Sequence, residues 1–327
     1  MIRFSLLLLI ALTLLIGCGD SPYEGWEFVG KPTDSSVRAL AISPEDPARL
    51  YLATQGDGLW LSNDSAQSWS QIIETTGQSV YCMLTVEENL YFGGDDGLWL
   101  FSDGIAAPLA LAGEAVWSLA KAEDGILVGT VGAASLYTDD SLIPLGGALP
   151  DCAITALATI PAGDGEQYLT GTLGAGLWQY DSLTAAWQPL IFRATAPLDA
   201  AEITLLNYNS ESQTLYAGTM NNGLYLSGDG GDHWYKERGI DPEYKQVGAL
   251  AVVDERLFIS TTGLRPAGLY YADLSGNRWR QWTDSPTSCR GLVQLADGSL
   301  LAATETEGLF TAYPPETDRL KPTPELP

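Results

Sequence analysis

The sequence predicts an all-β fold built from seven copies of one small unit. The first observation is a Gly-Leu-aromatic phrase, or a close variant, that returns every 38 to 47 residues along most of the chain. The second is that each copy lies among short apolar and aromatic segments separated by Gly-rich turns, the pattern of β-strands. The copies are Gly58–Trp60, Gly97–Trp99, Ser135–Tyr137, Gly176–Trp178, Gly223–Tyr225, Gly268–Tyr270 and Gly308–Phe310. This period is typical of propeller blades, and it predicts a seven-bladed β-propeller of four-stranded antiparallel blades over residues 26–313.

The four strands of each unit follow one another in a fixed order. The first is an apolar strand with small residues, as at 37–41, 80–84, 116–120, 154–158 and 247–251. Small side chains are expected there because the innermost strands crowd around the central axis. The second strand is β-branched and aromatic, and the Gly-Leu-aromatic phrase is the third. An aromatic-bearing segment is the fourth, as at 68–72, 233–236 and 278–282.

The last unit, from about Cys289, has no convincing fourth strand of its own, because the sequence after Tyr313 becomes Pro-rich. The segment Trp26–Val29 has the composition to supply that strand. Such a closure would complete the ring and leave no exposed sheet edge, which otherwise invites aggregation. We therefore predict that the N-terminal strand completes the last blade, and we expect residues 314–327 to be disordered.

The turn between the third and fourth strands carries a resemblance to a known superfamily. Residues 227–234 read Ser-Gly-Asp-Gly-Gly-Asp-His-Trp and match the Asp-box pattern Ser-x-Asp-x-Gly-x-x-Trp at every defined position, and residues 62–69 match it with Ala in place of Gly. With the blade period, the chain resembles the BNR/Asp-box propellers, which include sialidases, sortilin-type receptors, some glycoside hydrolases and the Ycf48-like assembly factors. The resemblance implies that Asp64 and Asp229 stabilise turns on the face opposite the ligand site.

The N-terminus predicts where the protein resides. Arg3 precedes an apolar run that ends at Ile16, and Leu15-Ile16-Gly17-Cys18 resembles a bacterial lipoprotein cleavage box. A run this short with these flanks is interpreted as a signal peptide, residues 1–17, and not as part of the fold. The mature chain would begin at a lipid-modified Cys18. Residues 18–25 would then tether the propeller to its membrane, on the periplasmic or cell-surface side.

Composition narrows the set of partners. The formal net charge is −25, and such a surface repels nucleic acid and anionic lipid head groups, so nucleic acid is not an expected partner. Three cysteines remain after Cys18, namely Cys82, Cys152 and Cys289, and none has the spacing of a zinc or redox motif. We expect all three to be structural, with a Cys152–Cys289 disulfide left open. We also expect a monomer without a metal or another cofactor.

Few residues are available for catalysis. The only histidine, His233, lies inside an Asp-box turn, which excludes His-based triads and His-based metal sites. The Arg-Ile-Pro-type segment of a sialidase is absent from the sequence. A glycosidase of another kind would need two carboxylates across a cleft, and a sugar or cation binder would also need acidic groups. The turns between second and third strands could supply these acidic groups, at Asp57, Asp95, Asp96, Glu305 and Glu307. In the alternative interpretation, the same residues are solvated or cap the backbone.

The second position of each inner strand is the best candidate for a ligand site, because it lies near the mouth of the central channel. Four neighbouring blades place large side chains there: Arg38, Tyr81, Trp117 and Arg290. Exposed Arg and aromatic residues anchor protein and peptide ligands. In the alternative, the rings pack between blades and the arginines pair with local carboxylates. The sequence thus favours a lipid-anchored, non-enzymatic propeller that binds a protein or peptide, such as an assembly or scaffold factor. The competing classes are an extracellular carbohydrate-active enzyme and a carbohydrate- or cation-binding module.

Overall fold

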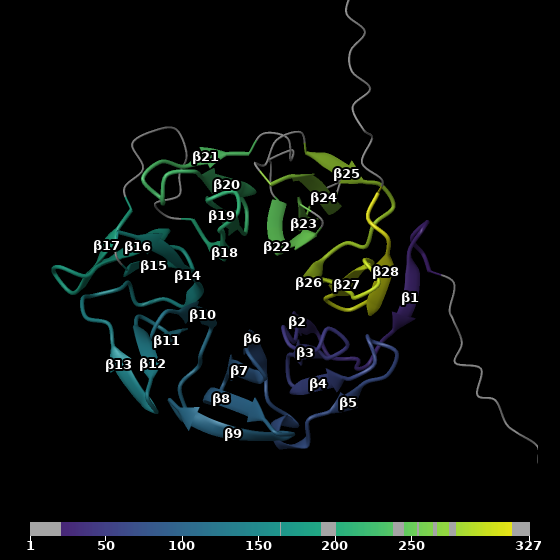
Figure 1. The fold of residues 1–327 in the computed structure, drawn as a ribbon, viewed down its shortest axis with the longest axis horizontal. Helices are drawn as coiled ribbons and strands as arrows, with labels where there is room; N and C mark the ends of the chain where they lie inside the picture. The colour runs from purple at the N-terminus through teal and green to yellow at the C-terminus, as the bar shows by residue number, and fades with distance from the viewer. Residues whose placement is uncertain are drawn as a thin grey trace, which may run out of the picture.

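Seven four-stranded antiparallel sheets are arranged around a central axis, so the predicted seven-bladed propeller is confirmed (Figure 1). The structure is a computed structural model that describes residues 21–163, 165–190, 201–237, 245–253, 255–263, 267–274 and 279–315. The predicted signal peptide, Cys18 and residues 316–327 lie outside the described residues. No helix in the described part of the chain is long and apolar enough to cross a membrane.

We number the blades from the first complete one. In blades 1 to 6 the strands run from the central axis to the rim in chain order, and in blade 7 the outermost strand is β1. Blade 1 contains β2 (Val37–Ile42), β3 (Leu50–Thr54), β4 (Leu59–Ser62) and β5 (Ser70–Gln71). Blade 2 contains β6 (Val80–Val86), β7 (Asn89–Gly94), β8 (Gly97–Ser102) and β9 (Ile105–Ala110). Blade 3 contains β10 (Ser118–Ala122), β11 (Gly125–Gly129), β12 (Ala134–Thr138) and β13 (Ser141–Pro144). Blade 4 contains β14 (Ile154–Ala162), β15 (Gly165–Thr172), β16 (Leu177–Asp181) and β17 (Ala186–Pro189). Blade 5 contains β18 (Ile203–Asn209), β19 (Thr214–Thr219), β20 (Leu224–Ser227) and β21 (Tyr235–Lys236). Blade 6 contains β22 (Lys245–Val253), β23 (Arg256–Gly263), β24 (Gly268–Asp273) and β25 (Arg280–Trp282). Blade 7 contains β26 (Cys289–Gln294), β27 (Leu300–Thr304), β28 (Leu309–Ala312) and β1 (Glu27–Gly30). One short 3₁₀ helix, η1 (Ile73–Thr75), follows blade 1.

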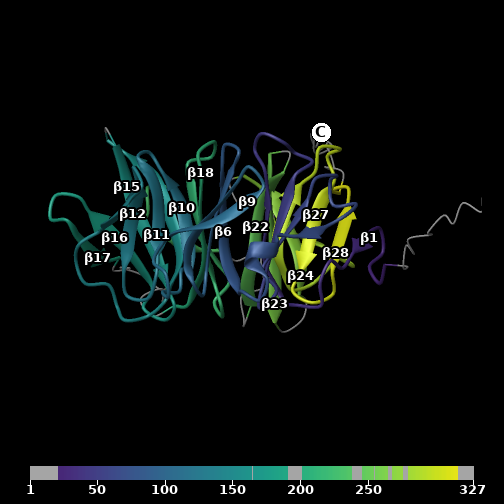
Figure 2. The ribbon, with the colours of Figure 1, turned by 90° about the horizontal axis from the view of Figure 1, so that it is seen from below.

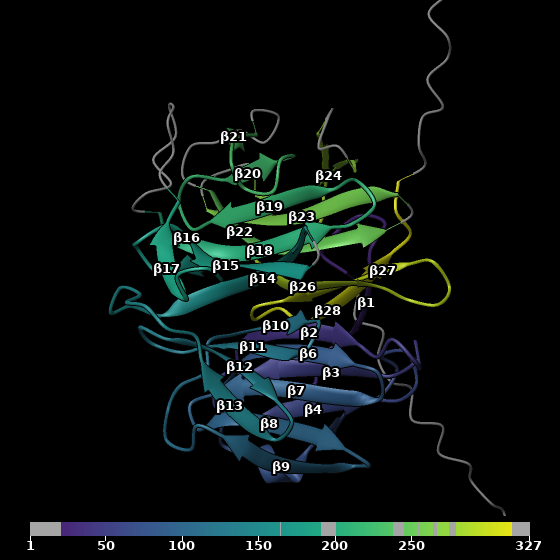
Figure 3. The ribbon, with the colours of Figure 1, turned by 60° about the vertical axis from the view of Figure 1, so that its left-hand side comes forward.

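The hydrophobic core lies between the blades, whose sheets face one another around the ring (Figure 3). A large residue at the start of an inner strand, or up to two residues before it, packs on a small residue of the second strand in the preceding blade. Val116 lies against Gly93 and Ile203 lies against Gly171, where an added Cβ would come within 2.3 and 2.4 Å of the neighbouring side chain. The large side chain on one blade therefore fills the space beside the glycine of its neighbour, and these contacts hold the inner strands in register around the ring.

The N-terminal strand closes the ring as predicted. Strand β1 pairs antiparallel with β28, with Glu27 opposite Thr311 and Phe28 opposite Phe310, and it forms the outer edge of blade 7 (Figures 1 and 2). Trp26 is 4% exposed and packs on Trp282 of blade 6, with ring centroids 4.6 Å apart. The N-terminal segment is thus clamped to two blades by aromatic side chains.

Several details differ from the expected elements. The fourth strands of blades 1 and 5 are only two residues long, because the turns before them take up the sequence through Trp69 and Trp234. Tyr23, in the segment expected to be a tether, packs edge-on against Phe310 with ring centroids 5.2 Å apart. Cys82, Cys152 and Cys289 are all free thiols, so the open possibility of a Cys152–Cys289 disulfide is not realised.

Candidate functional site

The predicted ligand residues lie at an irregularity that the sequence pattern did not reveal. Six inner strands carry a β-bulge, where the pairing register shifts across a single residue. The bulge is at the second residue of five of these strands and at the fourth residue of β22. The bulged residues are Arg38, Tyr81, Thr155, Thr204, Gly248 and Arg290. In blade 3 the equivalent residue is Trp117, which directly precedes β10 and donates its N–H to the Gly129 carbonyl at 2.8 Å. A bulge bends its strand and redirects a side chain, so one end of the central axis is surrounded by redirected residues.

Each of these residues is matched on its own blade by a residue within two positions of the end of the second strand, which we call its partner. These partners are Gln55, Asp95, Val131, Leu173, Met220, Thr262 and Glu305. A side-chain hydrogen bond joins the two in the pairs Arg38–Gln55, Tyr81–Asp95 and Arg290–Glu305. In five blades the backbone N–H of the partner, at Gln55, Asp95, Leu173, Met220 and Glu305, donates to the residue that precedes the inner strand, at 2.9 to 3.2 Å. We call these seven pairs the mouth ring. The sequence predicted the first member as a ligand residue on four blades, and of the second members it indicated only Asp95 and Glu305, as acidic-site candidates, because only the repeated register identifies the whole set.

The two arginines of the mouth ring are held by acceptors from this second set. Arg290 Nη2 donates to Glu305 Oε2 at 2.8 Å, and the Ser36 hydroxyl donates to the other carboxylate oxygen at 3.3 Å. Arg38 Nη2 donates to the side-chain carbonyl of Gln55. Arg290 therefore pairs with a local carboxylate, as in the alternative interpretation, whereas the acceptor for Arg38 is a neutral amide.

The two aromatic residues stack on each other across a blade boundary. The rings of Tyr81 and Trp117 are 4.5 Å apart and within 7° of parallel. The Tyr81 hydroxyl donates to Asp95. Burial raises the pKa of Tyr81, the hydrogen bond and charge of Asp95 raise it further, and the charge of Arg38 acts in the opposite direction. Tyr81 therefore stays protonated at neutral pH and is fixed in orientation by Asp95.

The other half of the mouth ring uses small residues that bind the next blade. The Thr155 and Thr204 hydroxyls donate to the Ile203 and Val247 carbonyls at 2.5 and 2.7 Å. A Cβ on Gly248 would lie 2.7 Å from the Cys289 carbonyl, so no larger residue fits without movement. The mouth ring is therefore asymmetric, with its large polar and aromatic side chains on blades 7, 1, 2 and 3.

The acidic residues of the alternative site each have their own hydrogen-bond partners. Asp57 accepts hydrogen bonds from Thr33 at 2.6 Å and from Gln71 at 2.9 Å, both near its own blade. Asp96 accepts from the Gly113 N–H at 2.7 Å, and Glu307 accepts from the Tyr23 hydroxyl. Asp95 and Glu305 belong to the mouth ring. Within the described ranges, no three His, Cys, Asp or Glu side chains come together in a way that could hold a metal ion.

The turns at residues 62–69 and 227–234 have the same hydrogen bonds. Asp64 accepts from the Ser68 N–H at 2.8 Å, and Asp229 accepts from the His233 N–H at 2.9 Å. The serine that begins each turn donates to the aspartate and accepts from the N–H four residues on, at 3.0 Å in the first turn and 2.9 Å in the second. Both turns lie at the opposite ends of the strands from the mouth ring, because antiparallel strands alternate direction.

Seven such sheets around one axis define a β-propeller, and the mouth ring is the candidate site for a ligand. No protein-family model and no curated protein matches the chain. Solved structures match its fold. The extracellular domain of BT4673 from B. thetaiotaomicron aligns with a TM-score of 0.70 and 15% identity over 89% of this chain, which covers 40% of that chain.

Two further solved structures are similar over nearly their whole length. YCF48 from Cyanidioschyzon merolae aligns with a TM-score of 0.64 and 13% identity, covering 89% of this chain and 99% of that chain. YCF48 bound to D1 peptide aligns with a TM-score of 0.67 and 14% identity, covering 92% and 99%. Likeness at this level of identity shows the fold alone.

Proposed function

We propose that this chain is a non-enzymatic, extracytoplasmic propeller that binds a protein or peptide segment at the mouth ring. The observation that carries the proposal is the adjacency of Arg290, Arg38, Tyr81 and Trp117 on consecutive blades, where two cations meet a stacked aromatic pair. Arg and aromatic residues dominate binding energy at protein interfaces. The proposal agrees with the fold likeness to YCF48, which has been solved with a bound peptide.

The arginines keep capacity for a ligand. A guanidinium carries five N–H donors. The Nε atoms of Arg38 and Arg290 are buried, and only one Nη of each side chain is used in the hydrogen bonds described above, so Nη donors remain for a ligand. Peptide carbonyls and carboxylates are suitable acceptors for the remaining donors. The stacked Tyr81–Trp117 pair adds a rigid aromatic surface beside them, which costs little conformational entropy on binding because Asp95 and the stacking already fix it.

Lipid anchoring at Cys18 is the second part of the proposal. It rests on the cleavage-box resemblance and on the fold likeness to an extracellular domain. The lipid would place the mouth ring near a membrane surface, where an assembly or scaffold factor meets its partners. A Cys18→Ser variant should leave the membrane fraction for the soluble extracytoplasmic fraction, whereas a variant that stays in the membrane would contradict the anchor.

Peptide binding at the mouth ring can be tested with a displayed library of random peptides selected on the purified propeller. The recovered peptides are then measured by fluorescence polarisation against the wild type, Arg38→Ala/Trp117→Ala and the control Arg49→Ala/Tyr235→Ala. The control removes the same kinds of side chain away from the mouth ring. We expect the first variant to bind about 30-fold more weakly or worse, and the control to bind normally.

Trp117 also packs inside the propeller, so the unfolding midpoint of each variant is measured in parallel. Arg38→Glu serves as a second variant because it leaves the stacked Tyr81–Trp117 pair intact. Equal binding by the wild type and a folded Arg38→Ala/Trp117→Ala protein would contradict the proposed site. Turnover of a fluorogenic glycoside by the wild type that is lost in Asp57→Asn or Glu305→Gln would instead identify an enzyme.

A further inference from the structure

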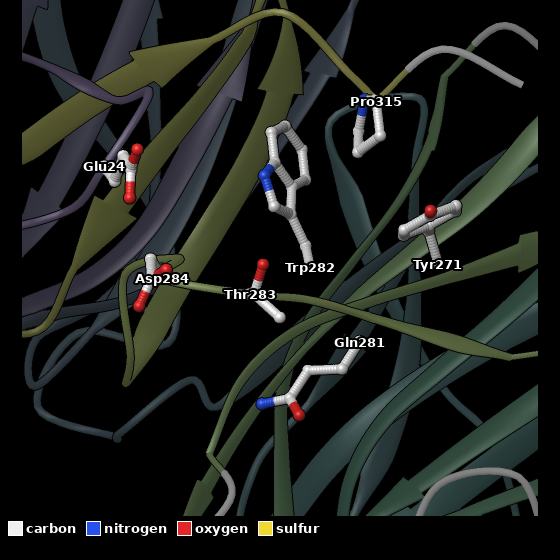
Figure 4. Close-up of a pocket in the computed structure, with 7 residues that line it drawn as sticks. All are labelled: Glu24, Tyr271, Gln281, Trp282, Thr283, Asp284 and Pro315. Atoms are coloured by element: carbon white, nitrogen blue, oxygen red, sulfur yellow. The ribbon is translucent and has the colours of Figure 1, made fainter.

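A pocket of about 450 Å³ lies at the rim of the propeller and shares no residue with the mouth ring. It is formed by the outer strands of blade 6, the segment before β1 and the chain just after β28. Its lining residues are Glu24, Tyr271, Gln281, Trp282, Thr283, Asp284 and Pro315 (Figure 4). Three parts of the sequence, far apart along the chain, thus build one concave site.

Aromatic packing fixes the centre of this rim pocket. Trp282 stands between Glu24 on one side and Pro315 and Tyr271 on the other (Figure 4). It packs on Trp26 with ring centroids 4.6 Å apart, and Tyr271 stacks on Phe258 at 5.7 Å. Both rings therefore have one side supported by the core and remain partly exposed at the pocket. Rings held in this way are preorganised to contact a ligand.

The charges around these rings are negative and unpaired. Glu24 and Asp284 are both exposed, and neither makes a hydrogen bond or an ion pair with any residue in the described part of the chain. Among the residues that the structure describes, no Lys or Arg lines the pocket. Arg256 lies nearby, but its Nη1 donates to the Pro315 carbonyl at 2.6 Å and its guanidinium lies over Phe258 at 5.3 Å. Two acidic side chains thus face the pocket, and the guanidinium of Arg256 is engaged by Pro315 and Phe258.

We propose that the rim pocket binds an organic cation, an alkylammonium group whose methyl or methylene groups contact Trp282 and Tyr271 while Glu24 and Asp284 supply opposite charge. Ammonium groups are attracted to aromatic faces, most strongly to that of Trp, and the attraction is larger where neighbouring carboxylates add to it. Choline is a probe of suitable size and shape. This site is independent of the mouth ring and of the function proposed for it.

The test compares choline with 3,3-dimethyl-1-butanol, a neutral molecule of the same shape, by isothermal titration calorimetry and by the midpoint of thermal unfolding at constant ionic strength. We expect choline to raise the midpoint and to bind at least about tenfold more tightly than the neutral alcohol. Glu24→Gln/Asp284→Asn should weaken choline binding by about fivefold. Glu27→Gln/Asp103→Asn, which changes an exposed residue on β1 and a turn residue of blade 2, is the matched control and should bind as the wild type does.

Two sources of the ammonium group are separated by using N-acetyl-lysine amide and phosphoethanolamine as further probes. Tighter binding of the lysine derivative would indicate a protein partner, and tighter binding of phosphoethanolamine would indicate a lipid head group; each would support the site. Equal binding of choline and the neutral alcohol, or choline binding unchanged in Glu24→Gln/Asp284→Asn, would overturn the proposal. Loss of peptide binding in the mouth-ring variants would not affect this outcome.

Discussion

Asp64 and Asp229 show how one side chain organises a turn. Each accepts hydrogen bonds from a backbone N–H four residues on and from the serine that begins its turn. Burial is the largest single influence on the pKa of Asp229 and raises it, but the hydrogen bonds from His233 and Ser227 together outweigh burial and hold the pKa below its usual value. We propose that both aspartates are structural, as the superfamily resemblance implies.

A pH-dependent loss of stability is expected from Asp229. Because its folded pKa is lowered, its contribution is present above the unfolded pKa of about 3.9 and is lost as the pH falls through the lower folded value. The contribution is less than about 1 kcal/mol, since the side chain is 44% exposed. Urea unfolding of wild type and Asp229→Asn should differ at pH 7, and the difference should be smaller at pH 3. The control Asp232→Asn, in the same turn, should follow the wild type at both values; a constant difference for Asp229→Asn would contradict the assignment.

The sequence identified the mouth residues only in part. Arg38, Tyr81, Trp117 and Arg290 could be located because they occupy one position in a repeated strand. Of their partners, Asp95 and Glu305 could be named only as candidates for an acidic site, and Gln55 and Val131 could not be found, since the four share no residue type and lie in turns of different sequence. The rim pocket was also out of reach, because its lining comes from separate parts of the chain that only the closed ring brings together.

At the scale of the strand, two devices shape the inner layer of the propeller. The first is the bulge at the second residue, which no hydrophobic pattern reveals because it inserts one residue without changing the strand's composition. The second is the close contact between blades, in which Gly93, Gly129, Gly171 and Gly218 leave room for the inner strand of the next blade. Strand order and approximate strand bounds follow from the repeat, whereas these two features need coordinates.

Filling one of these contacts should destabilise the propeller. A methyl group at Gly171 would lie 2.4 Å from Ile203 Cγ2, so we expect Gly171→Ala to lower the free energy of unfolding by about 1 to 3 kcal/mol. Gly228→Ala, where no atom lies within 4 Å of the new methyl group, is the control and should change stability little. The double variant Gly171→Ala/Ile203→Ala should lose less free energy of unfolding than the sum of the losses in Gly171→Ala and Ile203→Ala. Chemical denaturation of the wild type, the two single variants and the double variant measures this coupling. Strict additivity would contradict the contact.

The whole molecule depends on its closure. Strand β1 covers the free edge of β28, and Trp26 and Phe28 pack into the junction of blades 6 and 7. The composition of Trp26–Val29 and the missing fourth strand of the last unit were sufficient to predict this arrangement, because a propeller with an open edge is a poor solution to strand pairing. The mouth-ring site and the rim pocket both include residues whose positions depend on it.

Deleting residues 23–31 should therefore abolish the cooperative unfolding transition. The deletion removes the buried aromatic ring of Trp26 with that of Phe28, and its cost should exceed about 5 kcal/mol. The exposed edge of β28 should also promote association, which size-exclusion chromatography can detect. Glu27→Ala changes an exposed side chain of the same strand and should unfold as the wild type does. A monomeric deletion variant with the wild-type midpoint would contradict the closure.

The pairing of β1 with β28 also fixes an order of events during biosynthesis. Strand β1 leaves the ribosome among the first strands, but its partner is the last strand of the propeller to be made. Until then β1 has no place in a sheet, and the six intermediate blades can only form an open stack. A chain that terminates early keeps two unpaired strand edges and remains accessible to proteases, so only a translation product that extends through Ala312 can acquire the resistance of the closed ring.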